Sequence, residues 1–67
     1  MPIVRIEMLE GRSLAQKREL ARVITDAVCT IAHTTPEDTF VLFAEYSVEQ
    51  WASEGRLYLD QDDEQPR

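Results

Sequence analysis

The residue of this sequence that is best suited to do chemistry is Pro2, because it follows the initiator Met1. Methionine before a small residue such as proline is normally removed during synthesis, and its removal leaves Pro2 with a free secondary amine. An α-amino group has a reference pKa of about 7.7–8.0. Proline's amine is more basic, but an apolar pocket or nearby cations lower such a pKa, and a base tuned close to ambient pH can move protons on and off carbon. The alternative is structural, since proline is ordinary at the first position of a strand.

The familiar catalytic and metal-binding patterns are missing. The sequence contains no Ser-His-Asp arrangement, no HExxH and no CxxC motif. His33 and Cys29 lie four residues apart on a predicted helix, but two ligands do not make a closed metal site. A favourable interaction with the helix macrodipole is enough to explain His33 near the carboxyl end of the helix, without a catalytic role. No residue near Cys29 in the sequence marks its thiol as activated. No metal site is predicted.

Two segments, residues 2–9 and 39–46, are predicted to be strands because their side chains follow the two-residue period of a strand. In the first, apolar and charged side chains face opposite ways: Val4, Ile6 and Met8 against Arg5 and Glu7. In the second, both faces are apolar: Phe40, Leu42, Ala44 and Tyr46 on one, Val41 and Phe43 on the other. Apolar residues on both faces indicate burial on both sides. The chain's own helix can cover one side, so another subunit must cover the other.

The segment between these strands is predicted to form one helix, Leu14–Ala32. Ser13, followed three residues later by Gln16, matches a capping box at its start, and the stretch before Pro36 ends it. One apolar stripe runs along this helix at helical spacing; it consists of Leu20, Val23, Ile24, Ala27, Val28 and Ile31. Helical geometry places Cys29 opposite the stripe, as a surface or subunit-interface residue.

These elements predict an α+β fold. A helix of this length lets the two strands pair in parallel through a right-handed crossover, which gives a β-α-β protomer. The later stretches Gly55-Arg56 and Leu57-Tyr58-Leu59 are expected to form a short strand or hairpin arm. We place one domain at residues 1–59 and an acidic tail at residues 60–67, whose composition cannot bury enough apolar surface to order itself.

Length and charge exclude several classes of protein. A chain of 67 residues buries only about 60% of its unfolded surface, and small scaffolds gain stability from disulfides, metals or partner subunits. The single cysteine cannot form an internal disulfide, which leaves oligomerisation.

The net charge of −6, from 13 acidic and 7 basic residues, disfavours nucleic acid and anionic membranes as partners. No membrane span or signal peptide is visible, and an unpaired cysteine fits a reducing compartment. We therefore expect a cytoplasmic protein.

The beginning of the chain resembles 4-oxalocrotonate tautomerase and its relatives, over the run Pro2-Ile3-Val4-Arg5-Ile6-Glu7-Met8-Leu9-Glu10-Gly11-Arg12-Ser13, followed by Gln16-Lys17 on the helix. The specific part is Leu9-Glu10-Gly11-Arg12-Ser13 after an amino-terminal proline strand. The likeness continues through Glu45 and Trp51, and covers about residues 2 to 51. It implies that two protomers pair into a four-stranded sheet and that dimers gather into hexamers. It also implies isomerisation of small unsaturated 2-hydroxy or 2-oxo acids by proton transfer, with no cofactor.

The resemblance also assigns roles to individual residues. It makes Pro2 the general base and Arg12 the binder of a substrate carboxylate, which suits a planar, permanently charged guanidinium. Trp51 takes the place of the family's pocket phenylalanine, an apolar wall that holds the pKa of the Pro2 amine down. The backbone amide of Leu9 is expected to contact the substrate, as it does in relatives.

One position departs from the family pattern. The type enzyme carries a second catalytic arginine on the second strand, which polarises the substrate's oxo group from a neighbouring subunit, and this chain has Phe40 there. Stabilisation of that kind is often worth several kcal/mol, so another donor supplies it or the substrate differs. Arg56 is a candidate replacement for this arginine. The alternative is that Arg56 is an ordinary surface arginine exposed to solvent. The segment after Trp51 also lacks the family's Gly-rich hairpin, so the assembly could differ.

Two alternatives to a tautomerase stay open. Relatives use the same proline to add water to an activated double bond, which calls for a further carboxylate, and the nearest candidates in the sequence are Glu7, Glu10 and Asp38. The other alternative is a non-catalytic oligomeric scaffold that has lost the second arginine. Retention of Met1 would remove the basicity of Pro2 and end both catalytic hypotheses.

Overall fold

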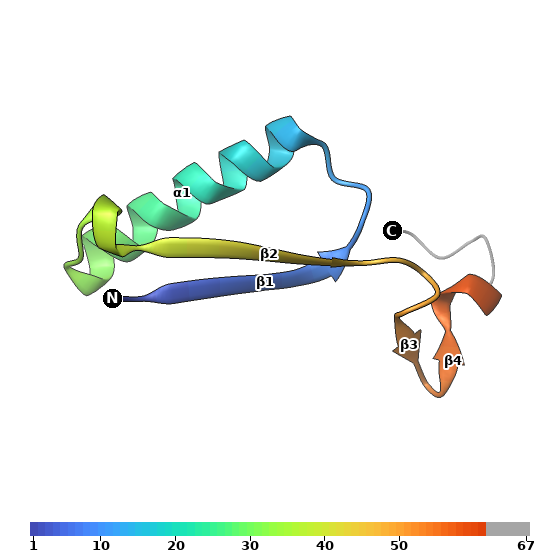
Figure 1. The fold of residues 1–67 in the computed structure, drawn as a ribbon. Helices are drawn as coiled ribbons and strands as arrows, with labels where there is room; N and C mark the ends of the chain where they lie inside the picture. Colours follow the sequence, from blue (N-terminus) through green and yellow to red (C-terminus); the bar gives the residue numbers. More distant parts are fainter. Residues whose placement is uncertain (62–67) are drawn as a thin grey trace.

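A computed structural model describes residues 1–61 as a β-α-β unit followed by a short hairpin arm (Figure 1). The strands are β1 (Ile3–Leu9), β2 (Phe40–Tyr46), β3 (Ala52–Ser53) and β4 (Arg56–Leu57). The long helix is α1 (Leu14–Ala32), and two short 3-10 helices are η1 (Pro36–Asp38) and η2 (Tyr58–Asp60). The predicted strands, helix and hairpin arm are confirmed. The tail expected at residues 60–67 begins inside η2, and its residues 62–67 lie outside the described residues.

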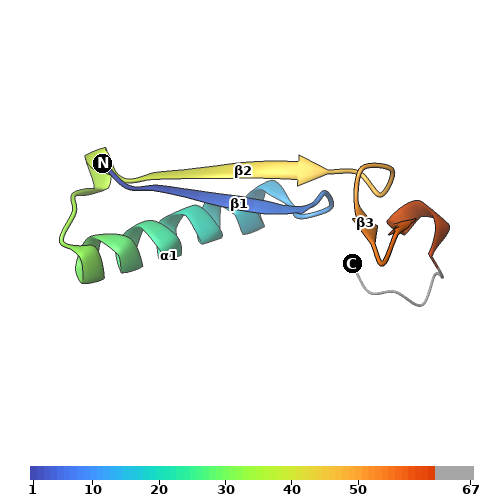
Figure 2. The same ribbon diagram turned by 90° about the horizontal axis from the view of Figure 1, so that it is seen from below.

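β1 and β2 pair in parallel, as predicted, in a register that runs from Ile3 opposite Phe40 to Leu9 opposite Tyr46. Figure 2 shows that α1 lies on one side of these two strands. The other side of the sheet is open, and it carries Ile3, Phe40 and Leu42 with 61%, 43% and 47% of their surface exposed. The prediction of an apolar sheet face that the protomer itself cannot cover is therefore confirmed.

The beginning of α1 is fixed by the predicted capping box. The Ser13 hydroxyl accepts a hydrogen bond from the Gln16 N–H at 3.1 Å, and the Gln16 side chain accepts one from the Ser13 N–H at 2.8 Å. Two of the helix's unpaired amino-terminal donors are thereby satisfied. At the other end His33 adopts the left-handed conformation, with φ 59°, and its N–H donates to the carbonyl of Cys29. His33 thus closes the helix as a backbone cap.

Within residues 1–61 no helix is long and apolar enough to cross a bilayer.

The face of α1 that meets the sheet differs from the predicted one. Ile24 and Val28 are half-buried as expected, but other members of the stripe stay exposed: Leu20, Val23, Ala27 and Ile31. Cys29, predicted opposite the stripe, lies on the sheet side, and its Sγ is 3.5 Å from Oγ1 of Thr39. That placement was wrong because the half-buried side of α1 carries Ala21, Ile24, Thr25, Val28 and Cys29, and so is rotated away from the centre of the predicted stripe. The sheet therefore covers only part of the helix's apolar surface.

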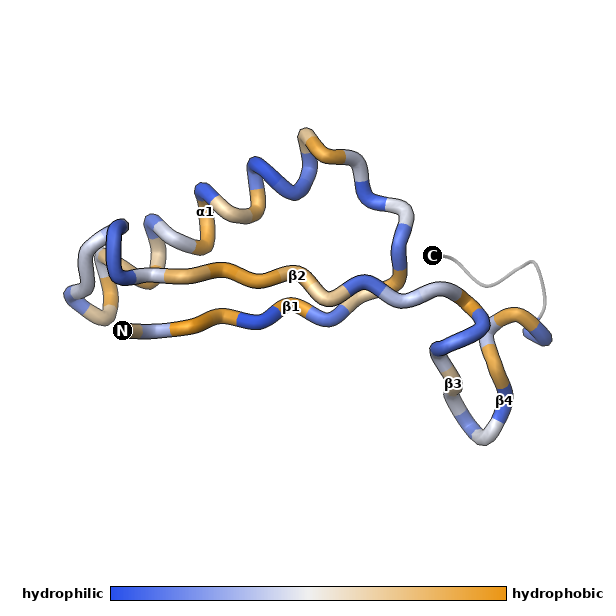
Figure 3. Tube along the Cα trace, viewed as in Figure 1, coloured by the Kyte–Doolittle hydropathy of each residue, from blue (hydrophilic) through white to orange (hydrophobic). Residues whose placement is uncertain are grey.

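The protomer has almost no interior. Among residues 1–61 no apolar side chain is buried, and the single buried residue is Thr39, with 8% of its surface exposed. The radius of gyration is 15.2 Å, against about 11 Å for a compact chain of this length. Figure 3 shows hydrophobic residues along the amino-terminal halves of both sheet strands, and alternation of hydrophobic and hydrophilic turns along α1. A protomer with this shape leaves on its surface the apolar area that normally stabilises a fold.

Candidate functional site

Pro2 lies at the start of β1, where its carbonyl accepts a hydrogen bond of 3.0 Å from the N–H of Phe40. This bond fastens the proline to the first residue of β2. Pro2 is half-buried, whereas Met1 ahead of it is 81% exposed. While Met1 is attached, the Pro2 nitrogen is an amide without basicity. Removal of Met1 would expose the ring nitrogen at the amino-terminal end of the sheet.

Arg12 lies at the other end of the sheet, in the turn between β1 and α1. The turn is closed by the N–H of Glu10, which donates to the carbonyl of Tyr46 at 2.9 Å. Gly11 has φ +129°, a conformation that favours glycine. An open depression in this turn is lined by Glu10, Gly11, Arg12 and Gln16. The exposed guanidinium of Arg12 has no ion-pair partner within residues 1–61, so its charge is available to an anion.

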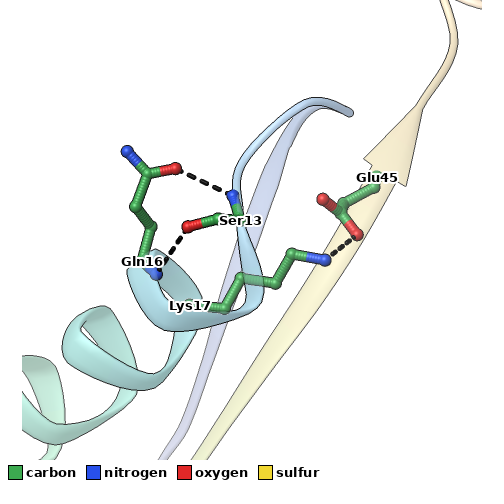
Figure 4. Close-up of polar contacts among 4 residues, drawn as sticks. All are labelled: Ser13, Gln16, Lys17 and Glu45. Atoms are coloured by element: carbon green, nitrogen blue, oxygen red, sulfur yellow. Dashed lines mark hydrogen bonds and ion pairs between the residues drawn. The ribbon is translucent and has the colours of Figure 1, made fainter.

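An ion pair fastens this turn to β2. Nζ of Lys17, in the first turns of α1, lies 2.6 Å from Oε1 of Glu45, and about a quarter of each side chain is exposed. Figure 4 shows Lys17 reaching across from the helix to β2, next to the capping box of Ser13 and Gln16. The Lys17–Glu45 pair therefore fixes the start of α1, and with it the Arg12 turn, relative to the sheet.

Trp51 lies beyond β2, between two tyrosines. Its ring centroid is 5.9 Å from that of Tyr46 and 6.3 Å from that of Tyr58, with tilted and edge-on geometry. Such arrangements are favourable for aromatic pairs. The Trp51 carbonyl also accepts a hydrogen bond of 2.8 Å from the Tyr58 N–H. Sequence reasoning identified Trp51 but missed both tyrosines, for which the available signal was their closeness to it along the chain.

Arg56 belongs to the hairpin arm and is exposed. Glu54 and Gly55, at φ 56° and 78°, form the tight turn between β3 and β4 that a two-residue hairpin of this kind requires. A guanidinium nitrogen of Arg56 donates to the carbonyl of Asp60 at 2.7 Å. Phe40 lies at the opposite end of β2, so one protomer does not bring Arg56 to the position it was expected to supplement.

The candidate residues thus form two groups at opposite ends of one sheet. Pro2 and Phe40 are at the amino-terminal end, and Leu9, Arg12 and Trp51 are at the carboxyl-terminal end. Seven strand residues at about 3.3 Å each put roughly 20 Å between Pro2 and Leu9. A small substrate cannot touch both groups within one protomer.

Comparisons with known proteins agree with this fold. The family model described as tautomerase enzyme matches residues 2–61. A probable tautomerase of Ralstonia nicotianae is 38% identical over 58 residues, 87% of this chain and 89% of that protein. One from Halalkalibacterium halodurans is 38% identical over 91% of this chain and all of its own length.

Solved structures give the same result. The crystal structure of a 4-oxalocrotonate tautomerase homologue has a TM-score of 0.88 and 32% identity, and covers 92% of this chain and 98% of its own. A heterohexameric 4-oxalocrotonate tautomerase of Chloroflexus aurantiacus has a TM-score of 0.84 and 31% identity over 92% of this chain and all of its own. With its β-α-β fold and a match across residues 2–61, this chain belongs to the tautomerase family.

Proposed function

We propose that the chain is a cofactor-independent tautomerase of small unsaturated 2-hydroxy or 2-oxo acids, acting in the cytoplasm with Pro2 as its general base. The observation that carries this proposal is Arg12, an exposed guanidinium that forms no ion pair with any other residue of the stretch 1–61, held on a glycine turn beside an open depression. A guanidinium of this kind binds a carboxylate through two parallel hydrogen bonds. Family membership supports the proton-transfer chemistry.

The proton would move in two steps. The free amine of mature Pro2 takes the proton of the substrate's enol hydroxyl, which leaves a conjugated enolate. The protonated amine then returns the proton to a carbon of the conjugated system, which gives the oxo acid and regenerates the base. Trp51 would form an apolar wall of the pocket, which favours the neutral amine. The negative oxygen of the enolate needs a donor, and the Leu9 N–H is our candidate, with Arg56 of a further subunit as the second.

The site becomes complete when two protomers pair antiparallel into a four-stranded sheet. Antiparallel pairing places the Pro2 end of one strand beside the carboxyl-terminal end of the other, where the partner's Leu9 and the partner's Arg12 lie. The exposed apolar residues of the open sheet face support further association of dimers. A hexamer is the assembly we propose, and the Chloroflexus relative is a heterohexamer.

The direct experiment follows the ketonisation of 2-hydroxymuconate and phenylenolpyruvate by ultraviolet absorbance. Loss of a general base costs about 10²- to 10⁴-fold, so Pro2→Ala should lose activity in that range. Arg12→Ala should mainly raise KM, because it removes a carboxylate contact. Arg22→Ala is the matched control, since Arg22 is an exposed arginine on α1 and its loss should leave both constants unchanged. Equal rates for wild type and Pro2→Ala would exclude Pro2 as the base.

Intact-mass measurement of the protein from its native host gives an independent check. The proposal requires a mass that lacks Met1, and the exposure of Met1 makes it accessible to an aminopeptidase. A mature protein that retains Met1 would contradict any catalytic role for Pro2. A non-catalytic scaffold would instead show a Pro2 amine that titrates like a model peptide in NMR.

A hydratase or dehalogenase on the same scaffold is the second candidate, and one observation favours it. Glu10 lines the depression that holds Arg12, so a carboxylate that could activate water accompanies the anion-binding group. The other two carboxylates are less suited. Glu7 already accepts a hydrogen bond from Tyr46 and forms an ion pair with Arg5. Asp38 lies in η1, at the end of the sheet away from Arg12. Turnover of 3-haloacrylates faster than ketonisation, and its loss in Glu10→Gln, would favour this reaction.

A further inference from the structure

Two apolar side chains, Ile3 and Phe40, accompany Pro2 at the amino-terminal end of the sheet. The N–H of Phe40 donates to the carbonyl of Pro2 at 3.0 Å, and Phe40 lies opposite Ile3 in the strand register. Ile3 and Phe40 keep 61% and 43% of their surface exposed, whereas the next residues, Val4 and Val41, are half-buried. Because side chains alternate along a strand, Ile3 and Phe40 both project from the open face, next to the proposed base.

The positive charges among residues 1–61 lie away from the Ile3–Phe40 pair. Of these basic residues only Arg5 belongs to β1 or β2. Its Nε lies 3.7 Å from Oε2 of Glu7, so its side chain reaches along β1 in the direction away from Pro2. The others are on α1 and its preceding turn, or on the hairpin arm: Arg12, Lys17, Arg18, Arg22 and Arg56.

The charged residues that adjoin Phe40 in the chain are negative. Glu37 and Asp38 are exposed residues of η1, which ends two residues before Phe40. Figure 1 shows this short helix at the same end of the sheet as the amino terminus. Neither carboxylate forms an ion pair within residues 1–61. The Pro2 end of the sheet is therefore apolar on its open face and acidic beside it.

We propose that the site selects acids with one carboxylate and an apolar tail, and that Phe40 is the residue that rejects a second carboxylate. The inference rests on the proposed function, in which the partner's Arg12 lies beside Pro2 and holds the carboxylate next to the enol carbon. The tail then lies against Ile3 and Phe40. A carboxylate at the far end of the tail would lose water there without gaining a cation, which is costly.

Two features of the proposed assembly act in the same direction. Association of dimers over the open face would remove more water from the Ile3–Phe40 pair, and so raise the cost of placing a charge there. The Arg56 of a further subunit, if it reaches the site, is assigned to the enolate oxygen. It would therefore not neutralise a second carboxylate at the other end of the substrate.

Binding of two matched acids tests the selectivity without turnover. Sorbate and trans,trans-muconate share one diene chain and differ only in a methyl group in place of a carboxylate, and neither carries the enol hydroxyl. They are titrated calorimetrically into the assembled protein lacking Met1. The buffer is kept at about pH 8, where an ordinary histidine is neutral, because His33 closes α1 at this end. The wild type should bind sorbate at least about tenfold more tightly.

Substitutions of Phe40 separate charge from shape. Phe40→Arg should reverse the preference, because it supplies the missing cation, and Phe40→Leu should keep the preference for sorbate. Val23→Arg is the matched control, since it adds the same charge at an exposed position of α1 and should leave the ratio of dissociation constants unchanged. Glu37→Gln combined with Asp38→Asn leaves the sheet intact and should narrow the preference roughly threefold at low salt.

Three results would overturn the selectivity: muconate bound as tightly as sorbate by the wild type, no binding of either acid, or an unchanged preference in a folded Phe40→Arg protein. The same ratio is then measured in kcat/KM, with 2-hydroxyhexa-2,4-dienoate against 2-hydroxymuconate. A protein that prefers sorbate but ketonises neither substrate loses the proposed function and keeps the selectivity. A protein that ketonises both equally well keeps the function and loses the selectivity.

Discussion

The Lys17–Glu45 pair gives a prediction whose size follows from its burial. Lys17→Met keeps a long, helix-favouring side chain and leaves the Glu45 carboxylate three-quarters buried without its cation. Removing one partner of a fully buried pair costs about 3–5 kcal/mol, whereas an exposed pair is worth about 0–1 kcal/mol. With about a quarter of each side chain exposed, we expect an intermediate loss of about 2 kcal/mol in the free energy of unfolding.

The assay is urea unfolding followed by circular dichroism, at one fixed protomer concentration because oligomer stability depends on concentration. The matched control is Arg22→Met on the same helix, whose pairs with Glu19 and Asp26 are about two-thirds exposed. It should change the free energy of unfolding by no more than about 0.5 kcal/mol. Adding Glu45→Leu to Lys17→Met should recover much of the loss, since apolar replacement of a buried pair is often neutral. Equal losses in Lys17→Met and Arg22→Met would refute the reasoning.

The Arg12 turn and its neighbours give further predictions. Gly11→Ala should lower the free energy of unfolding by about 1 kcal/mol through backbone strain alone, because no atom lies within 4 Å of the added Cβ; an unchanged melting temperature would contradict it. Ser13→Ala removes the side-chain acceptor of the capping box and should cost about 1 kcal/mol in the same measurement, while Ser13→Asp should retain most of the stability. In kinetics, both Gly11→Ala and Ser13→Ala should raise KM more than they lower kcat, since each disturbs the placement of Arg12; a loss confined to kcat would speak against that role.

Local patterns in the sequence were sufficient to predict the helix and the two long strands of this fold. The capping box sets the start of α1, and alternation sets β1 and β2, because these patterns depend on residues close together along the chain. The face that α1 turns to the sheet depends instead on how the helix packs against both strands, which no single segment encodes. Cys29 was misplaced for that reason.

In the candidate site too, local sequence signals predicted individual residues but not the contacts and distances between distant segments. Pro2, Arg12 and Trp51 were identified from motif and resemblance, but the distance between the two ends of the sheet became evident only once the register of β1 and β2 was known. The tyrosines around Trp51 and the bond from Arg56 to Asp60 depend on how the chain folds back after β2. These contacts form where the chain turns back on itself, and the periodicity of hydrophobic residues does not predict them.

The separation of Pro2 from Arg12 has a genetic consequence. Under the proposed pairing, each site draws its base from one polypeptide and its carboxylate binder from the other. A mixture of Pro2→Ala and Arg12→Ala chains would then form hybrids in which one site carries both defects and the other carries neither. At substrate concentrations well below the raised KM of Arg12→Ala, these two impaired alleles expressed in the same cell would complement each other, at a level set by how freely their products exchange partners.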